Sequence, residues 1–143
     1  MKKIMRYVLI AVLVIIFIVA FVLLSDPLRQ SDKRIKADML RITPVGTSIE
    51  DVIAIIENND NWQIEHTWDR GYSLKYGYPT GSHQDFIKHD DASIVGVKGM
   101  EVYIGSYNFL FFILEERVSI YYGFAEDSTL VDLAVRKDAM DII

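Results

Sequence analysis

The amino-acid sequence contains no cysteine, and this absence removes several classes of function. Without thiols the protein forms no disulfide framework, no cysteine-ligated zinc or iron–sulfur centre and no cysteine nucleophile. It also lacks the cysteine that carries the lipid of a bacterial lipoprotein. Internal repeats and low-complexity segments are absent too, while 51% of the 143 residues are apolar and 12% are aromatic. This length and composition predict one ordinary folded domain rather than a disordered chain.

Motifs that carry chemistry are also missing from the sequence. There is no Gly-x-Ser-x-Gly nucleophile elbow, no Gly-x-Gly-x-x-Gly fingerprint and no Walker loop. Adjacent acidic pairs such as Glu115-Glu116 point to opposite faces of an extended segment, so we interpret them as surface charge rather than as an acid/base pair. We therefore predict that the protein is not an enzyme and has no catalytic residue, no cofactor and no metal.

The longest apolar run lies near the N-terminus. Residues 7–24 are 18 consecutive positions without a charge, and Tyr7 is the only one with a polar side-chain atom. A helix of that length is about 27 Å long, close to the hydrocarbon thickness of a bilayer. Basic residues lie in the preceding segment, residues 1–6, which favours a cytoplasmic N-terminus. The sequence predicts a single-pass helix in the inner (plasma) membrane, with the rest of the chain outside the cytoplasm.

A cleaved secretory signal is the alternative interpretation of this run. Such signals have an apolar core of about 7–15 residues followed by a small-x-small cleavage site. Here the run is longer, and residues 21–25, Phe-Val-Leu-Leu-Ser, offer no such site. We favour an uncleaved anchor, and both interpretations place the remaining chain on the same side of the membrane.

The chain after the apolar run is acidic. Because three of the 15 basic residues precede that run, the other 119 residues carry 12 basic and all 20 acidic residues, a formal net charge of −8. This charge argues against nucleic-acid binding and against a body that docks flat on anionic lipid. Solubility is the simplest reason for it.

Two helices are predicted directly after the membrane segment. Residues 25–42 form a juxtamembrane helix or linker, in which Ile35 and Met39 have the spacing of one helix face and Pro44 ends the helix. The domain proper is expected over residues 43–143. It opens with a capping box at residues 47–50, Thr-Ser-Ile-Glu, in which Thr47 would accept a hydrogen bond from the amide of Glu50.

The remaining sequence has the period of β-strands. Apolar and polar residues alternate over residues 62–68, 118–124 and 130–137; residues 93–107 are also expected to be strand, and residues 109–114 are wholly apolar. Residues 71–91 form a long stretch rich in glycine, tyrosine, serine and aspartate. Helices followed by strands predict an α+β fold, with two helices packed on one face of an antiparallel sheet of about four strands.

Aromatic residues mark the best candidate for a binding site. Trp68, Tyr72, Tyr76 and Tyr78 lie within eleven positions, and Tyr and Trp are enriched at protein–protein hot spots. We predict these four as partner-binding residues, with packing of the tryptophan and tyrosines at the base of the loop as the alternative.

Histidines form the only other cluster of potential ligands. His83, Asp85 and His89 fit no known metal-ligand spacing, so we interpret them as part of a solvated loop, with a small metal-binding sensor or enzyme as the alternative. His66 alternates with tryptophans, which favours a packed or edge histidine over a general base.

Two short segments resemble a known class of envelope proteins. Residues 43–52, Thr-Pro-Val-Gly-Thr-Ser-Ile-Glu-Asp-Val, resemble the start of the second helix in the SmpA/OmlA (BamE-like) and β-lactamase-inhibitor-protein-like class. Residues 118–132 resemble the hairpin of that class, in which an aromatic-rich strand meets an acidic turn and a Leu-x-(Asp/Glu) strand. The resemblance implies two helices on an antiparallel sheet and non-enzymatic protein binding. BamE-like proteins carry a lipid anchor, whereas here a membrane helix takes its place.

These observations predict a membrane-anchored extracytoplasmic module of the bacterial envelope that binds a protein. An immunity or inhibitor protein against a toxin or secreted hydrolase is an alternative, because an acidic body steers towards a basic partner. The expected partners are thus the membrane, through the protein's own helix, and a second protein, with no nucleic acid.

Overall fold

The computed structural model describes residues 2–24, 26–73, 94–109 and 114–141, and within these the α+β prediction is confirmed. Four strands form an antiparallel sheet in the order β1-β4-β5-β6: β1 (Gln63–Trp68), β4 (Lys98–Phe109), β5 (Leu114–Phe124) and β6 (Leu130–Asp141). The short strands β2 (Tyr72–Ser73) and β3 (Ile94–Val95) pair separately. The predicted strand over residues 93–107 is therefore divided between β3 and β4, because Gly96 takes a positive φ of 77°.

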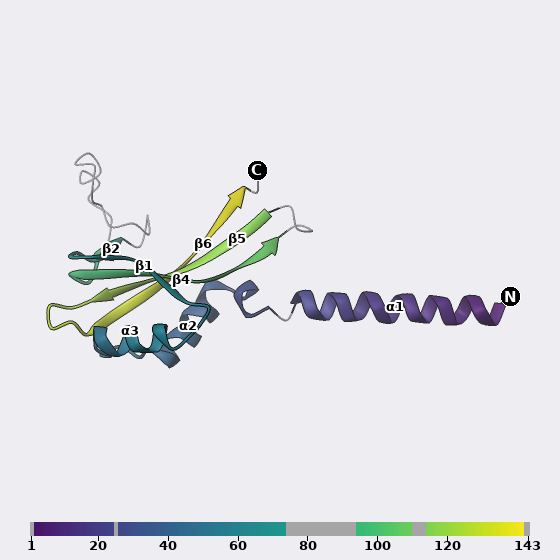
Figure 1. Ribbon diagram of the computed structural model, residues 1–143, viewed down its shortest axis with the longest axis horizontal. Helices are drawn as coiled ribbons and strands as arrows, with labels where there is room; N and C mark the ends of the chain where they lie inside the picture. Colours follow the sequence, from purple (N-terminus) through teal and green to yellow (C-terminus); the bar gives the residue numbers. More distant parts are fainter. Residues whose placement is uncertain (1, 25, 74–93, 110–113, 142–143) are drawn as a thin grey trace.

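The N-terminal helix α1 (Lys2–Leu24) projects away from the rest of the molecule (Figure 1). Within it, Ile4–Phe21 is long and apolar enough to cross a membrane, and none of this window is buried against the protein. Signal sequences have the same features. Isolated in this way, the helix exposes an apolar surface around its whole circumference, which is costly in water and favourable in lipid.

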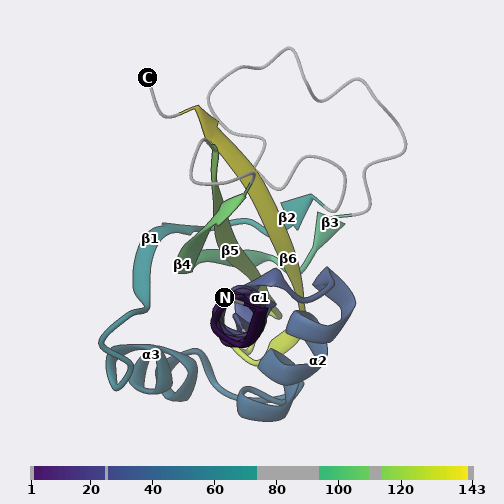
Figure 2. The same cartoon turned by 90° about the vertical axis from the view of Figure 1, so that its right-hand side faces the viewer.

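Three short helical elements follow and cover one face of the sheet (Figures 1 and 2). They are the 3₁₀ helix η1 (Pro27–Arg29), α2 (Asp32–Ile42) and α3 (Ile49–Glu57). Ile35 and Met39 of α2 are buried as the i,i+4 spacing predicts, and Val52 and Ile56 are the buried residues of α3. Both pairs join strand residues such as Val102 in one continuous hydrophobic core. The helix expected beside the membrane thus contributes to the core of the folded body.

The start of α3 differs by one residue from the predicted capping box. Ser48, rather than Thr47, is the N-cap: its Oγ accepts from the Asp51 amide at 3.1 Å and donates to Asp51 Oδ2 at 2.8 Å. The reason is a backbone bridge between Ser48 and Thr129, which keeps the chain extended up to Ser48 and delays the helix. Thr47 instead donates its hydroxyl to the carbonyl oxygen of Pro44.

Candidate functional site

A bulge in the edge strand β1 places Glu65 and His66 on the face of the sheet opposite the helices. The alternating sequence predicts Ile64, His66 and Trp68 on one face. The register shifts between Ile64 and His66, so that Ile64 lies opposite Val102 while His66 lies opposite Glu101. Val102 belongs to the core, and its neighbour Glu101 faces the other side of the sheet because side chains alternate along a strand. His66 and Trp68 therefore face outward, away from the face of Ile64, and His66 is the edge histidine of the two predicted alternatives. Bulges often re-aim side chains in this way next to functional sites.

Side chains from three neighbouring strands meet on this outward face. His66 Nδ1 lies 3.4 Å from Oε2 of Glu101, and the Tyr121 hydroxyl donates to the other carboxylate oxygen of Glu101 at 2.9 Å. Arg117 on β5 forms an ion pair with Glu65. We call this group the outer-face cluster; its members are Glu65, His66, Glu101, Tyr103, Arg117 and Tyr121.

The exposure of the cluster members differs strongly. The His66 side chain is 64% exposed, whereas the carboxylate of Glu101 lies on a side chain that is only 11% exposed. Glu101 is therefore held by its neighbours beneath an accessible imidazole. The hydrogen bond from Tyr121 fixes Oε1 of Glu101, and an N–H at Nδ1 of His66 would leave Nε2 directed away from the carboxylate.

Charge compensation in the cluster centres on Arg117. Burial acts to lower the pKa of Arg117, but the hydrogen bond and charge of Glu65 outweigh it and hold that pKa above the usual value. The guanidinium also lies 4.6 Å from the centroid of the Tyr103 ring. Arg117, Glu65 and Glu101 together carry a formal charge of −1.

Aromatic rings extend the cluster along the same face. Trp68 stacks between two rings, with centroid separations of 5.9 Å to His66 and 6.3 Å to Tyr121. Tyr72 packs at 6.3 Å from Tyr121 and is completely buried. Of the predicted partner-binding residues, Trp68 is thus half-buried beside the cluster and Tyr72 is part of the packing beneath the small sheet. Tyr76 and Tyr78 lie outside the described residues, as do His83, Asp85 and His89.

Glycines allow the small sheet β2–β3 to lie directly on the large one. A Cβ atom on Gly123 would stand 2.7 Å from the Val95 carbonyl oxygen and 3.0 Å from Cε1 of Tyr72. A Cβ on Gly99 would stand 2.9 Å from the carbonyl oxygen of Arg70. The small sheet therefore covers one end of the outward face and leaves the outer-face cluster beside it.

The cluster also contains the elements of a cation site. Glu65, His66 and Glu101 each offer one ligand atom, and these atoms lie within 4.8 Å of one another. Carboxylate and imidazole groups suit divalent metals. Arg117, however, already forms an ion pair with Glu65, and its positive charge would repel a metal ion. The ion pair between Arg117 and Glu65 thus argues against a fully coordinated metal in this arrangement.

Sequence reasoning did not identify Glu65, Glu101, Arg117 or Tyr121 as site residues. The sequence did contain one signal for a site residue. It is a charged residue between apolar neighbours in a strand, such as Glu101 between Met100 and Val102. The bulge that turns Glu65 towards Arg117 has no such signal, because it depends on pairing with a distant strand.

Comparison with known proteins adds no relative. No family model, no curated protein and no solved structure matches the chain. The resemblance to BamE-like domains remains a prediction from the two short segments that carry it.

Proposed function

We propose that the protein is a single-pass, membrane-anchored module of the bacterial envelope that binds another protein outside the cytoplasm and catalyses no reaction. The observation that carries this proposal is the division of the molecule into two parts. The Ile4–Phe21 segment of α1 is not buried against the body, and the described part of the body has a hydrophobic core of its own. If α1 spans a membrane, its apolar surface lies in lipid. The folded body then remains free to act as a recognition domain.

The outward face of the sheet supplies the recognition surface in this proposal. The helices cover the opposite face, so the outer-face cluster is not used in closing the core (Figure 1). It combines an exposed imidazole, a held carboxylate and an arginine stacked on Tyr103. Tyrosine, tryptophan and arginine are the residues most enriched at binding hot spots. The net negative charge of the body favours a partner whose contact surface is basic.

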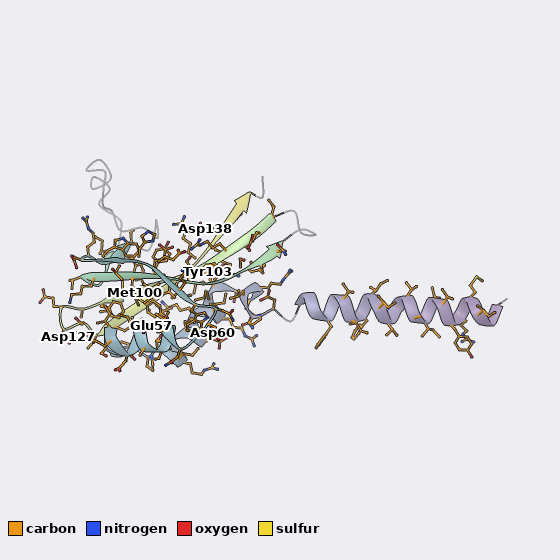
Figure 3. The ribbon with its side chains drawn as sticks, viewed as in Figure 1. Glu57, Asp60, Met100, Tyr103, Asp127 and Asp138 are labelled. Carbon is orange, nitrogen blue, oxygen red and sulfur yellow. The ribbon has the colours of Figure 1, made fainter. Side chains whose placement is uncertain are left out.

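Site-specific photo-crosslinking in intact membranes tests this surface. A benzoylphenylalanine replacing Tyr103 should give one discrete crosslinked species, and His66→Ala should reduce its yield severalfold. His66 suits this test because its side chain is 64% exposed, so the substitution should leave the fold intact. The same probe at Glu57, an exposed position on α3, is the control; Figure 3 labels Tyr103 and Glu57. Equal crosslinking at both positions, or none at Tyr103, would contradict the assignment.

Divalent metal binding by the outer-face cluster is a second candidate, favoured by the convergence of Glu65, His66 and Glu101. Calorimetric titration of the purified full chain with Zn²⁺ should then show one site that Glu101→Gln abolishes. Glu57→Gln, which changes a carboxylate on the far side of the body, is the matched control. If the heat of Zn²⁺ binding is the same in Glu101→Gln and Glu57→Gln, the cluster is excluded as the metal site.

A further inference from the structure

The segment that leaves α1 is basic, although the body that it leads into is acidic. Residues 26–42, which contain η1 and α2, carry five basic and three acidic residues, a formal net charge of +2. Residues 43–143 carry seven basic and 17 acidic residues, a formal net charge of −10. The excess of positive charge is therefore confined to the part of the chain next to the membrane helix.

The three acidic residues of this segment bind groups within the protein. Asp26 accepts a hydrogen bond from a backbone amide of η1 at 2.9 Å, and Asp38 Oδ1 lies 3.3 Å from the guanidinium of Arg41. Asp32 lies 3.8 Å from Nζ of Lys137, on the last strand of the sheet. The carboxylates of the segment are thus paired with groups other than the cations in the first turn of α2.

Two of the five cations in the segment have no partner among the described residues. Arg29 donates to a backbone carbonyl oxygen of β4 at 2.5 Å, and Lys36 forms an ion pair with Asp132. Lys33 and Arg34 are exposed in the first turn of α2. No hydrogen bond or ion pair joins either side chain to another residue in the described part of the chain. Both cations are therefore free to bind a group outside the protein.

The contacts of η1 place these cations at the end of the body that lies next to α1. Arg29 follows Leu24, the last residue of α1, by five positions, and five extended residues span at most about 18 Å. The bond from Arg29 to Asn108 fixes η1 at one end of β4, and Lys33 lies only four residues beyond Arg29. In Figure 1 the segment between α1 and α2 lies on the side of the body from which α1 leaves.

Acidic residues at the far end of the body are too distant to cancel this charge. Gly99 lies nine positions along β4 from Asn108, which corresponds to roughly 30 Å at about 3.4 Å per residue. The Debye length at physiological ionic strength is only about 8 Å. At the near end, Glu115 and Glu116 each accept a hydrogen bond from a side chain of β4. A membrane at the α1 end therefore meets the charge of η1 and α2 rather than the net charge of the whole body.

We propose that Lys33 and Arg34 bind the anionic headgroups of phospholipids in the membrane that α1 spans. This inference rests on the proposed membrane anchor, because α1 brings η1 and α2 to the bilayer surface. The guanidinium of Arg34 can donate two parallel hydrogen bonds to one phosphate, and Lys33 adds a second positive charge. Each Lys or Arg close to an anionic lipid surface strengthens the contact by about fivefold.

The division of charge along the chain also sets the orientation of the body in this proposal. Anionic lipid attracts the basic segment at residues 26–42 and repels the acidic remainder of the chain. The body therefore stands on the end that carries η1 and the start of α2, and it does not lie flat on the membrane. Lipid charge would thus hold the outer-face cluster in a constant orientation relative to the bilayer.

Fluorescence quenching by lipids with a nitroxide headgroup tests the contact directly. Because the chain has no cysteine, Ala37→Cys can carry a single fluorophore in the full-length protein, reconstituted in vesicles that contain the quencher lipid. Ala37 is exposed on α2, one turn beyond Lys33. Vesicles of phosphatidylcholine alone are compared with vesicles of phosphatidylcholine and phosphatidylglycerol, each at low and at high salt.

Two double variants with the same loss of charge identify the cations that make the contact. Lys33→Gln with Arg34→Gln removes the proposed binding residues. Arg70→Gln with Lys98→Gln is the matched control at the far end of the body: Lys98 precedes Gly99 in β4, and the carbonyl oxygen of Arg70 lies close to Gly99.

We expect quenching at Ala37 to be at least about twofold greater in vesicles with phosphatidylglycerol, and we expect high salt to remove the difference. The double variant at Lys33 and Arg34 should lose the difference, and the matched control at Arg70 and Lys98 should keep it. Equal quenching in the two kinds of vesicle, or the same response in both double variants, would overturn the headgroup contact.

A label at Val14→Cys, in the apolar part of α1, reports separately on the anchor through quenching by lipids with brominated acyl chains. Quenching at Val14 without the effect of phosphatidylglycerol at Ala37 overturns this inference and leaves the anchor intact. An unquenched label at Val14 shows that α1 does not enter the bilayer, and the proposed anchoring function then fails. The two labels therefore separate the failure of this inference from the failure of the proposed function.

Discussion

Lys36 on α2 and Asp132 on β6 form an ion pair, with Nζ 2.8 Å from Oδ2. The two residues are 96 positions apart, so the pair connects the segment that follows the membrane helix to the last strand of the sheet. Lys137 adds a longer contact to Asp32, at 3.8 Å, at the start of the same helix. Helix α2 is thereby held along β6, and the folded body begins within a few residues of the apolar segment.

Met39→Ala measures how much α2 contributes to the core. Met39 is 4% exposed, and truncation of a buried methionine removes apolar contacts and leaves a cavity. We expect the free energy of unfolding of the full chain in detergent to fall by about 2–5 kcal/mol. Ile42→Ala, on the same helix but 46% exposed, is the control, with an expected change of about 0.5 kcal/mol. Equal small effects would show that α2 acts as a linker.

Arg117→Ala tests the electrostatic centre of the outer-face cluster. Arg117 and Glu65 are 28% and 23% exposed, so removal of the guanidinium leaves a partly buried carboxylate without its partner. We expect a loss of about 1–3 kcal/mol in urea unfolding. Arg41→Ala breaks an exposed pair with Asp38 and should cost about 0.5 kcal/mol or less. If both arginines behave alike, the Arg117–Glu65 pair has no special role in holding this face together.

Buried tyrosines predict loss of stability at alkaline pH. Burial raises the pKa of Tyr122 from 10.0 to about 12, and burial also raises the pKa of Tyr72 and Tyr107. Above pH 10 the unfolded chain ionises while the folded chain keeps its protons, so stability is complete below pH 10 and is lost as the pH rises towards 12.

The contribution of Tyr122 is about 1.4 kcal/mol per pH unit within that window. Urea unfolding midpoints at pH 9, 10 and 11 measure the slope. Tyr122→Phe removes the ionisable group at the same ring volume, so it should flatten the profile. An unchanged slope in that variant would assign the alkaline loss to other groups.

Gly123→Ala tests the close contact between the two sheets. The added methyl would meet the Val95 carbonyl oxygen at 2.7 Å, and a backbone atom there cannot move aside cheaply. We expect destabilisation of about 1–3 kcal/mol and a change in the near-ultraviolet circular dichroism of Tyr72 and Tyr121. Gly46→Ala is the comparison: its Cβ meets nothing within 4 Å, and strain at φ 91° should cost about 1–2 kcal/mol without that spectral change.

Local sequence patterns predicted most of the fold, but they did not predict the candidate site. The spacing of Ile35 and Met39 and the change of period after residue 61 depend on neighbours in sequence, so they predict two helices and a sheet. The position of His66 depends on a bulge and on its register with Glu101, which only the paired strands define. A one-residue shift in a strand reverses the face of every later side chain. Local sequence therefore predicted the alternation of β1, but not the bulge that turns His66 and Trp68 away from the face of Ile64.

The proposed function requires that α1 spans the membrane and that the folded body lies outside the cytoplasm. Labelling of single cysteines in intact cells with a membrane-impermeant maleimide tests it most directly, at Glu126 in the body and at Lys3 before the apolar run. We predict labelling of Glu126→Cys in intact cells, labelling of Lys3→Cys only after permeabilisation, and full-length protein in the membrane fraction. Protection of Glu126→Cys in intact cells, or a shortened protein free of the membrane, would contradict the account.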